Sequence, residues 1–81
     1  MSTNLREWRA ANPVELGGAL ARLRQSRELT QEELAAKTGL RREYLSRMES
    51  GLATEQVKSL FAVLREEGFE LVISPREVPR G

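Results

Sequence analysis

Apolar residues recur at helical spacing in the first half of the chain. Leu16, Leu20 and Leu23 lie three or four positions apart, which places them on one face of a helix. Asn12 is a favourable N-cap residue, and the proline that follows it suits the first helical position, where no backbone N–H is needed. The pattern therefore predicts a helix over residues 13–27.

Two shorter helices are predicted next. Thr30 begins the sequence TQEE, a capping box in which its hydroxyl accepts from the backbone N–H of Glu33 while the Glu33 carboxylate accepts from the backbone N–H of Thr30. This signal predicts a helix over residues 31–38. Gly39 follows, where a positive φ is common and glycine meets no steric penalty. A further helix is expected over residues 41–50.

A fourth helix is predicted over residues 55–67, between Thr54 as N-cap and Gly68 as terminator. Its spacing of apolar residues gives it one face directed to the core. That face consists of Val57, Leu60, Phe61 and Leu64.

The pattern changes after this helix. The β-branched and aromatic residues at positions 69–73 predict a strand that ends before Pro75. A strand needs a hydrogen-bonding partner, and no other segment has a strand pattern, so we expect it to pair with the same strand of a second copy. An extended tail packed on the fourth helix is the alternative. The expected dimer contacts are Phe69, Leu71, Val72 and Ile73.

These elements predict one mainly α-helical domain. Its parts are an N-terminal segment at 1–12 whose Trp8 covers the core or meets a partner, the helices at 13–67, the dimerisation strand at 68–75 and a flexible tail at 76–81. With 81 residues the core is small, so association with a second copy is a natural source of stability.

Composition excludes several kinds of chemistry. The chain has no cysteine and no histidine, so disulfides and thiolate or imidazole metal sites are excluded. Nucleophile–histidine pairs are absent for the same reason, and we expect neither an enzyme nor a cofactor. No apolar run approaches the roughly 20 residues that span a bilayer. The first twelve residues lack the apolar core of a secretory signal, so we expect a cytoplasmic protein without membrane contact.

Charge is unevenly distributed along the chain. The net charge is +1, but residues 1–30 carry five arginines against three glutamates, whereas residues 55–81 carry four basic and five acidic groups. The segment from Arg41 to Arg47 adds three arginines. This asymmetry suits a DNA-facing surface at one end and a protein-facing surface at the other. A GC-rich gene, in which arginine codons are favoured over lysine codons, explains the arginine bias equally well.

The central segment resembles a known DNA-binding motif. Gln31, Ala35, Gly39 and Leu45 stand at the positions of the helix-turn-helix signature of the Cro/repressor-like (XRE-type) family. The resemblance extends over residues 16–61. It implies a lambda-repressor-like domain of four to five helices, here with one short C-terminal β-strand paired across a dimer. The helix at 41–50 would then enter the major groove of DNA.

The resemblance implies roles for individual residues. Arg24 and Glu49 occupy the positions of an ion pair that is structural rather than DNA-reading, and Gln31 stands where a phosphate contact is expected. Arginine donates to guanine O6 and N7, and glutamate accepts from cytosine N4. The expected DNA-binding residues are Arg41 and Arg42 for guanine, Glu43 for cytosine, and Tyr44 for a thymine methyl or a phosphate. Gln31, Ser46 and Lys58 are expected to contact phosphates, and Arg47 lies one turn beyond Glu43.

The four-helix domain followed by one strand also resembles the HipB-type antitoxins. That resemblance implies a homodimer that binds a palindromic operator on double-stranded DNA, represses its own operon and binds a kinase-like toxin. The segment around Trp8 departs from this pattern. The alternative function is a protein-interaction module with little DNA binding. Its contacts would come from Trp8, Glu55, Glu66, Glu67 and the tail.

Overall fold

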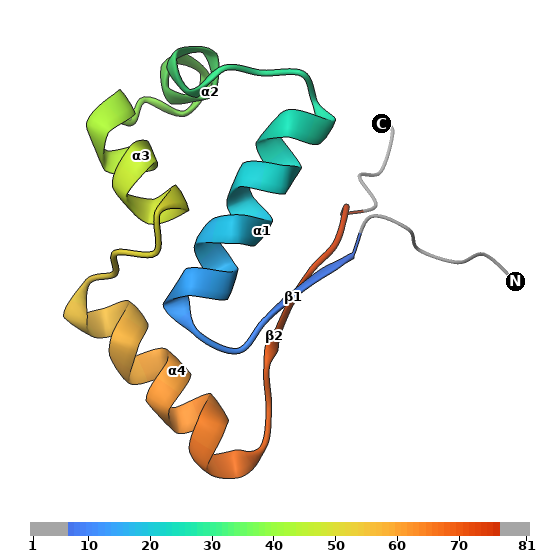
Figure 1. The fold of residues 1–81 in the computed structure, drawn as a ribbon, viewed down its shortest axis with the longest axis vertical. Helices are drawn as coiled ribbons and strands as arrows, with labels where there is room; N and C mark the ends of the chain where they lie inside the picture. Colours follow the sequence, from blue (N-terminus) through green and yellow to red (C-terminus); the bar gives the residue numbers. More distant parts are fainter. Residues whose placement is uncertain (1–6, 77–81) are drawn as a thin grey trace, which may run out of the picture.

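Four helices and a two-stranded sheet make up the fold in the computed structural model, which describes residues 7–76 (Figure 1). Helices α2 and α3 lie on one side of α1, the sheet lies on the other, and α4 runs below α1 in the view of Figure 1. This mainly helical arrangement is that of a lambda-repressor-like domain. The elements are β1 (Trp8–Ala10), α1 (Pro13–Ser26), α2 (Gln31–Thr38), α3 (Arg42–Glu49), α4 (Glu55–Glu67) and β2 (Leu71–Ile73).

Three of the four helices begin at a side-chain cap that the sequence predicts. The side-chain amide oxygen of Asn12, Oδ1, accepts from the backbone N–H of Glu15 at 2.8 Å. Thr30 forms the full capping box of α2, with bonds of 3.0 and 2.8 Å. The Thr54 hydroxyl accepts from the backbone N–H of Val57 at 3.3 Å. Helix α3 has no side-chain cap and begins one residue later than predicted.

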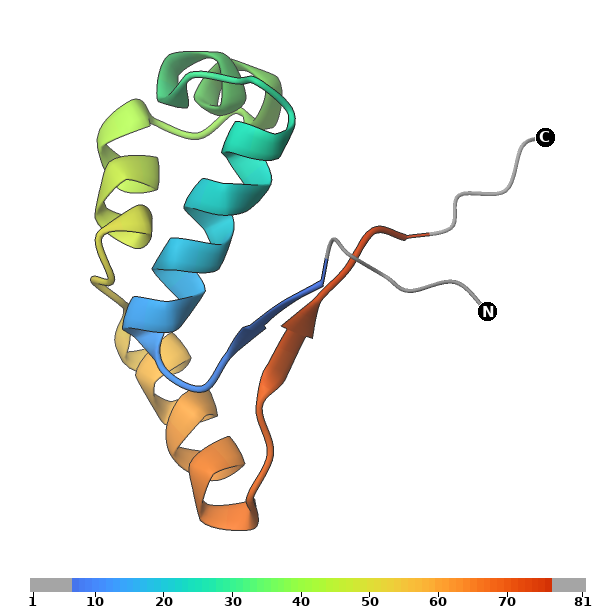
Figure 2. The same ribbon diagram turned by 45° about the vertical axis from the view of Figure 1, so that its right-hand side comes forward.

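The sheet corrects the prediction of a single strand. Strand β1 pairs with β2 in antiparallel fashion within the same chain, with Trp8 opposite Ile73 and Ala10 opposite Leu71 (Figure 2). The expectation that no other segment forms a strand was wrong, because three residues are too short to establish a recognisable alternation. Pairing with a second copy stays a prediction.

Strand β2 is also shorter than predicted at its start. Gly68 adopts a left-handed φ of 80° at the C-cap of α4, and the backbone N–H of Phe69 donates to the Leu64 carbonyl at 2.8 Å. Phe69 therefore belongs to the helix-terminating turn rather than to the ladder. Its side chain is 67% exposed.

The buried core is small, and much apolar surface remains outside it. Leu60, which we expected on the core face of α4, is 45% exposed, and Leu40, directly after Gly39, is 39% exposed. The buried apolar residues are Ala10, Ala19, Ala35, Leu45 and Phe61. In residues 7–76 no helix is long and apolar enough to cross a membrane. Most of the predicted tail, residues 77–81, lies outside the described residues, as do residues 1–6 of the N-terminal segment.

Two adjacent glycines of α1 have different surroundings. A Cβ on Gly17 would collide with the backbone carbonyl oxygens of Met48 and Glu49, so this glycine allows α1 and the end of α3 to approach closely. A Cβ on Gly18 would meet nothing within 4 Å. Packing therefore explains Gly17, and nothing in the structure requires Gly18.

Candidate nucleic-acid interface

The turn between α2 and α3 is formed by the left-handed Gly39 and the extended Arg41. Gly39 adopts φ 75°, and the backbone N–H of Leu40 donates to the Ala35 carbonyl at 3.1 Å, which closes the end of α2. Arg41 is extended, with φ −80° and ψ 144°, and redirects the chain into α3. Ala35 and Leu45 are buried, at 5% and 3% exposure. The turn thus holds the two short helices together with little side-chain volume between them.

A bidentate ion pair joins the end of α1 to the end of α3. Arg24 Nε donates to Glu49 Oε2 at 2.7 Å, and Arg24 Nη2 donates to Glu49 Oε1 at 3.1 Å. Arg24 Nη1 donates further to the Leu29 carbonyl at 2.8 Å. The side chains are 14% and 7% exposed. Because the guanidinium fork is planar, these bonds fix the direction of α3 against α1 as well as its distance.

The same bonds shift the titration of the carboxylate. The pKa of Glu49 is lowered from its ordinary value chiefly because Arg24 donates to its charged form. Burial opposes this effect, and a hydrogen bond from Gln31 adds to it. The pKa of Arg24 is raised, mainly by its hydrogen bond to Glu49. The pair is therefore ionised at neutral pH.

The side chain of Gln31 faces the protein in this structure. Its Nε2 donates to Glu49 Oε1 at 3.0 Å, which makes Gln31 a third member of the ion-pair network. An amide nitrogen has two N–H bonds, so one is left for another acceptor. The sequence placed Gln31 correctly at the start of α2 but gave no sign of this partner, because Glu49 is 18 positions away.

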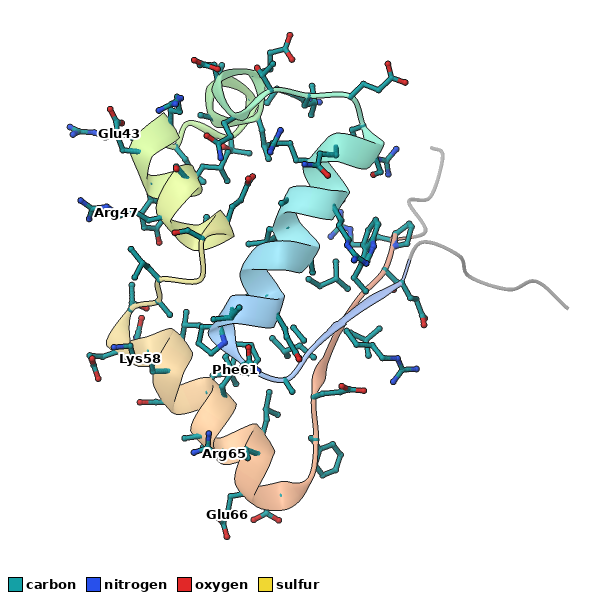
Figure 3. The ribbon with its side chains drawn as sticks, viewed as in Figure 1. Glu43, Arg47, Lys58, Phe61, Arg65 and Glu66 are labelled. Atoms are coloured by element: carbon teal, nitrogen blue, oxygen red, sulfur yellow. The ribbon has the colours of Figure 1, made fainter. Side chains whose placement is uncertain are left out.

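The N-cap and the first two turns of α3 present charged side chains to solvent. Arg41, Arg42, Glu43, Tyr44 and Arg47 are exposed, and Ser46 is half-buried. Glu43 and Arg47 project from the side of α3 that faces away from α1 (Figure 3). The structure thus brings most of the predicted base-reading residues onto one accessible helix.

Two of the predicted cations have acidic neighbours. Arg42 Nε lies 3.5 Å from Glu32 Oε2 of α2, an exposed pair that the sequence did not indicate. Lys58 Nζ lies 3.5 Å from Glu55 Oε2, one helical turn earlier. Exposed pairs of this length contribute about 0–1 kcal/mol, so either cation is free to exchange its carboxylate for a phosphate. Lys58 lies toward the same edge of the view as Arg47 in Figure 3.

A comparison with protein families matches this region. The sequence profile described as "Helix-turn-helix" matches residues 20–65, which include α2, α3 and most of α4. The chain belongs to the helix-turn-helix family. This membership agrees with the resemblance found in the sequence and points to a DNA-binding, non-enzymatic role.

A curated relative supports the same assignment for this helix-turn-helix protein. The chain is 38% identical over 69 residues to a protein of Sinorhizobium fredii (strain NBRC 101917 / NGR234) named "Uncharacterized HTH-type transcriptional regulator y4dJ". The match covers 82% of this chain and 90% of the relative. No solved structure gives a significant match. In residues 7–76, no group of three or more acidic residues is arranged to hold a metal ion.

Proposed function

We propose that this helix-turn-helix protein is a transcriptional repressor that binds double-stranded DNA with α3 in the major groove. The observation that carries the proposal is the exposed arginine face of α3 on a rigid support. The capping box, the Gly39 turn and the Arg24–Glu49 pair hold the helix without using that face. The helix-turn-helix family match and the relative's name as a transcriptional regulator support the proposal.

Within that proposal, the exposed residues divide by chemistry. Arg41 and Arg42 read guanine through bidentate hydrogen bonds, and Glu43 accepts from cytosine N4. Tyr44 contacts a thymine methyl or a phosphate, and Arg47 extends the contact by one turn. Phosphate contacts come from Ser46, Lys58 and the remaining N–H of Gln31.

The operator is expected to be palindromic and read by a homodimer. One recognition helix covers too few base pairs for tight specific binding, and two-fold dimers place two of them about 34 Å apart. One edge of β2 is paired with β1, so a second copy would add at the other edge and give a four-stranded sheet. Phe69 and Val72 are exposed beside that edge, at 67% and 47%. Leu71 and Ile73 are half-buried and support the strand from inside.

We extend the proposal to the role of an autoregulating antitoxin with a kinase-like toxin as its partner. Two features support a protein partner: the resemblance to HipB-type antitoxins, and the exposed apolar residues Leu60 and Val63 on α4. The alternative is a protein-interaction module with little DNA binding, whose contacts would come from Trp8, Glu55, Glu66, Glu67 and the tail. Co-purification with the product of the neighbouring gene, without binding to the promoter, would favour the module.

The DNA-binding proposal is tested by removing the two arginines at the start of α3. The double variant Arg41→Ala with Arg42→Ala should lose specific binding to DNA selected from a random pool, measured by fluorescence anisotropy. Each guanine contact contributes about 1–3 kcal/mol of discrimination. Arg65→Ala, on exposed α4, removes one arginine elsewhere and should keep specific binding. Unchanged affinity in the double variant, with an unchanged circular dichroism spectrum, would refute the assignment.

Polar substitutions in and next to β2 test the dimer proposal. Phe69→Ser combined with Val72→Lys should shift the protein to monomer in sedimentation equilibrium, because both changes remove exposed apolar surface beside the free edge of β2. Val14→Lys is the control, since Val14 is 68% exposed on α1 and lies beside Gly51, outside both strands. A double variant that stayed dimeric would place the interface elsewhere, with α4 the next segment to test.

A further inference from the structure

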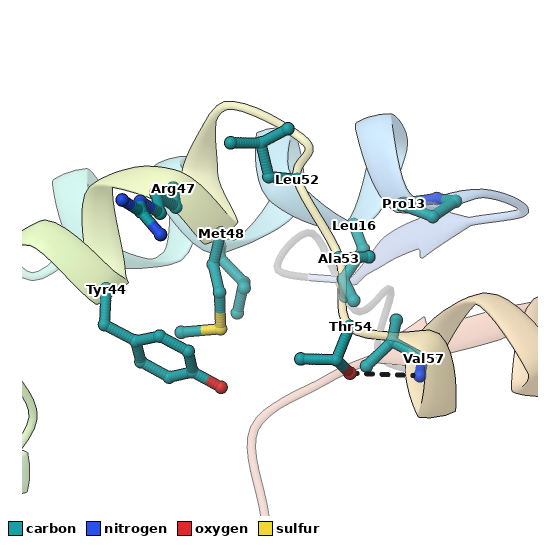
Figure 4. A pocket seen from close by; sticks show the side chains of 10 residues that line it. Pro13, Leu16, Tyr44, Arg47, Met48, Leu52, Ala53, Thr54 and Val57 are labelled. Atoms are coloured by element: carbon teal, nitrogen blue, oxygen red, sulfur yellow. Dashed lines mark hydrogen bonds between the residues drawn. The ribbon is translucent and has the colours of Figure 1, made fainter.

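A hydrophobic pocket of about 210 Å³ lies between α1, α3 and the start of α4 (Figure 4). It opens to solvent beside the recognition helix. An apolar cavity of about 150 Å³ is large enough to hold benzene, so this pocket suits a body of one aromatic ring. Its apolar wall consists of Leu16, Leu20, Met48, Leu52, Ala53 and Val57.

Two polar side chains of α3 also line the pocket. Tyr44 extends across it in Figure 4, with its hydroxyl end pointing toward the side of Thr54, and Arg47 lies one turn further along the helix. The Thr54 hydroxyl already accepts from the backbone N–H of Val57. Within residues 7–76, the guanidinium of Arg47 makes no ion pair. A cation beside an apolar, ring-sized pocket complements an apolar molecule that carries a negative charge.

We infer that this pocket binds a small aromatic carboxylate. The ring lies against the apolar wall, and the carboxylate accepts hydrogen bonds from Arg47 at the mouth. Arg47 and Tyr44 are also part of the proposed DNA surface, so the ligand acts as an effector that weakens operator binding. This regulatory part rests on the proposed function, whereas ligand binding itself does not.

The coupling has a simple physical basis. The Arg47 guanidinium that is held by a carboxylate at the pocket is not available to a base or a phosphate. Because coupling between two binding sites is reciprocal, a ligand that weakens DNA binding is itself bound more weakly when DNA is present, by the same factor. The buried Leu45 keeps α3 in place, so the change is confined to the exposed side chains.

The pocket has a built-in reporter for a direct test. Methionine occurs at positions 1 and 48, so methyl-labelled methionine gives two NMR signals, and Met48 lines the pocket. Phenylacetate, titrated into the free protein without DNA, should shift the Met48 signal. It should bind about tenfold more tightly than neutral phenylacetamide, a ratio equal to about 1.4 kcal/mol and typical of a charge-assisted hydrogen bond. In Arg47→Gln the two ligands should bind equally.

A filled pocket gives the matched control. Ala53→Leu adds side-chain volume to the pocket wall and should abolish the Met48 shift, whereas Ala62→Leu, on the exposed surface of α4, should leave it unchanged. The site is refuted if the Met48 signal does not respond to phenylacetate up to about 10 mM, because a ligand with a dissociation constant of about 1 mM would nearly saturate the site at that concentration. It is also refuted if the wild-type protein binds the acid and the amide equally. The Arg47→Gln comparison does not depend on the folding of Ala53→Leu.

Operator binding tests the regulatory part. Saturating phenylacetate should weaken binding of the wild-type protein to its selected DNA about tenfold, the size of a typical coupling. It should not affect Ala53→Leu, which keeps its DNA contacts. A shift of Met48 without any change in DNA affinity would overturn the effector role. A protein that binds no specific DNA would overturn the proposed function, and the Met48 titration would still decide the pocket.

Discussion

The two halves of the molecule are held together by different means. Both halves have a capped helix that ends at a left-handed glycine, but within residues 7–76 only the half formed by α2 and α3 is tied to α1 by a part-buried network of directed hydrogen bonds, in which Arg24 and Gln31 donate to Glu49. In the half formed by α4 and the sheet, two three-residue strands meet, and large apolar side chains such as Val63 and Phe69 stay exposed, at 61% and 67%. The second half therefore leaves apolar surface that another molecule can cover.

This contrast has a consequence for how each half tolerates change. A directed, partly buried network fails when one member is removed, because the remaining charge has no partner. A sheet with an exposed ion pair, such as Arg9 with Glu70 at 2.8 Å, loses little when that pair is broken, because water replaces the partner. The following variants test whether stability is concentrated in the ion-pair network as the contrast predicts.

The largest effect is expected from Arg24→Ala. The change leaves the Glu49 carboxylate, 7% exposed, and the Leu29 carbonyl without their guanidinium donor. Breaking a buried pair in this way costs about 3–5 kcal/mol in free energy of unfolding, measured by urea denaturation. Arg9→Ala in the sheet is the matched control and should change stability little. Equal losses in the two variants would show that the halves do not differ as proposed.

A second large effect is expected where α1 meets α3. Gly17→Ala introduces a Cβ against the carbonyl oxygens of Met48 and Glu49, the latter at 2.7 Å, and backbone atoms cannot move aside as a side chain does. Overpacking of this kind costs about 1–3 kcal/mol in unfolding free energy. Thermal unfolding measures it. A variant as stable as the wild type would mean that the two helices are not in close contact in solution.

Acid should weaken the same network by a smaller amount. The folded-state pKa of Glu49 is lowered, so its contribution to stability is complete above the unfolded value, about 4.3, and is lost as the pH falls through the folded value. Protonated Glu49 still accepts a hydrogen bond, so the loss is smaller than that from deleting Arg24. Unfolding free energies measured between pH 6 and pH 3, at about half-unit steps, should fall more in the wild type than in Glu49→Gln. Parallel curves would contradict the assignment.

The smallest effect has the opposite sign. Gly18→Ala places a methyl group in open space and replaces a flexible residue inside α1 by a strong helix former. The expected gain is up to about 1 kcal/mol in unfolding free energy. In the same thermal unfolding experiment, Gly18→Ala should raise the stability of the protein whereas Gly17→Ala should lower it. Destabilisation by Gly18→Ala would indicate a contact at this position that the structure does not show.

The sequence predicted those parts of the fold that depend on neighbouring residues. Each N-cap side chain accepts a hydrogen bond from the backbone N–H three residues downstream, as in Asn12, Thr30 and Thr54. Gly39 and Gly68 end helices through their own backbone conformation. Each signal lies within one or two helical turns of its effect. The helix boundaries were therefore correct to within a residue, and the family resemblance that depends on them was confirmed.

Long-range partners were the part that the sequence did not reveal. Nothing near Trp8 indicates that its strand pairs with residues more than sixty positions away, and nothing near Gln31 points to Glu49. The same holds for Arg42 with Glu32, which meet across the turn. The arginines of α3 could be named as candidate DNA contacts from their type and position. Their roles stay predictions, because DNA contacts are set by a molecule outside the chain.

The pairing of the first strand with the last has a mechanical consequence. Trp8 lies opposite Ile73 at the end of the sheet nearest both chain ends, so a pulling force applied between the ends would open the ladder one residue pair at a time rather than shear it as a whole. Under such a force the sheet should separate before the helices, in the order Trp8–Ile73, Arg9–Val72, Ala10–Leu71.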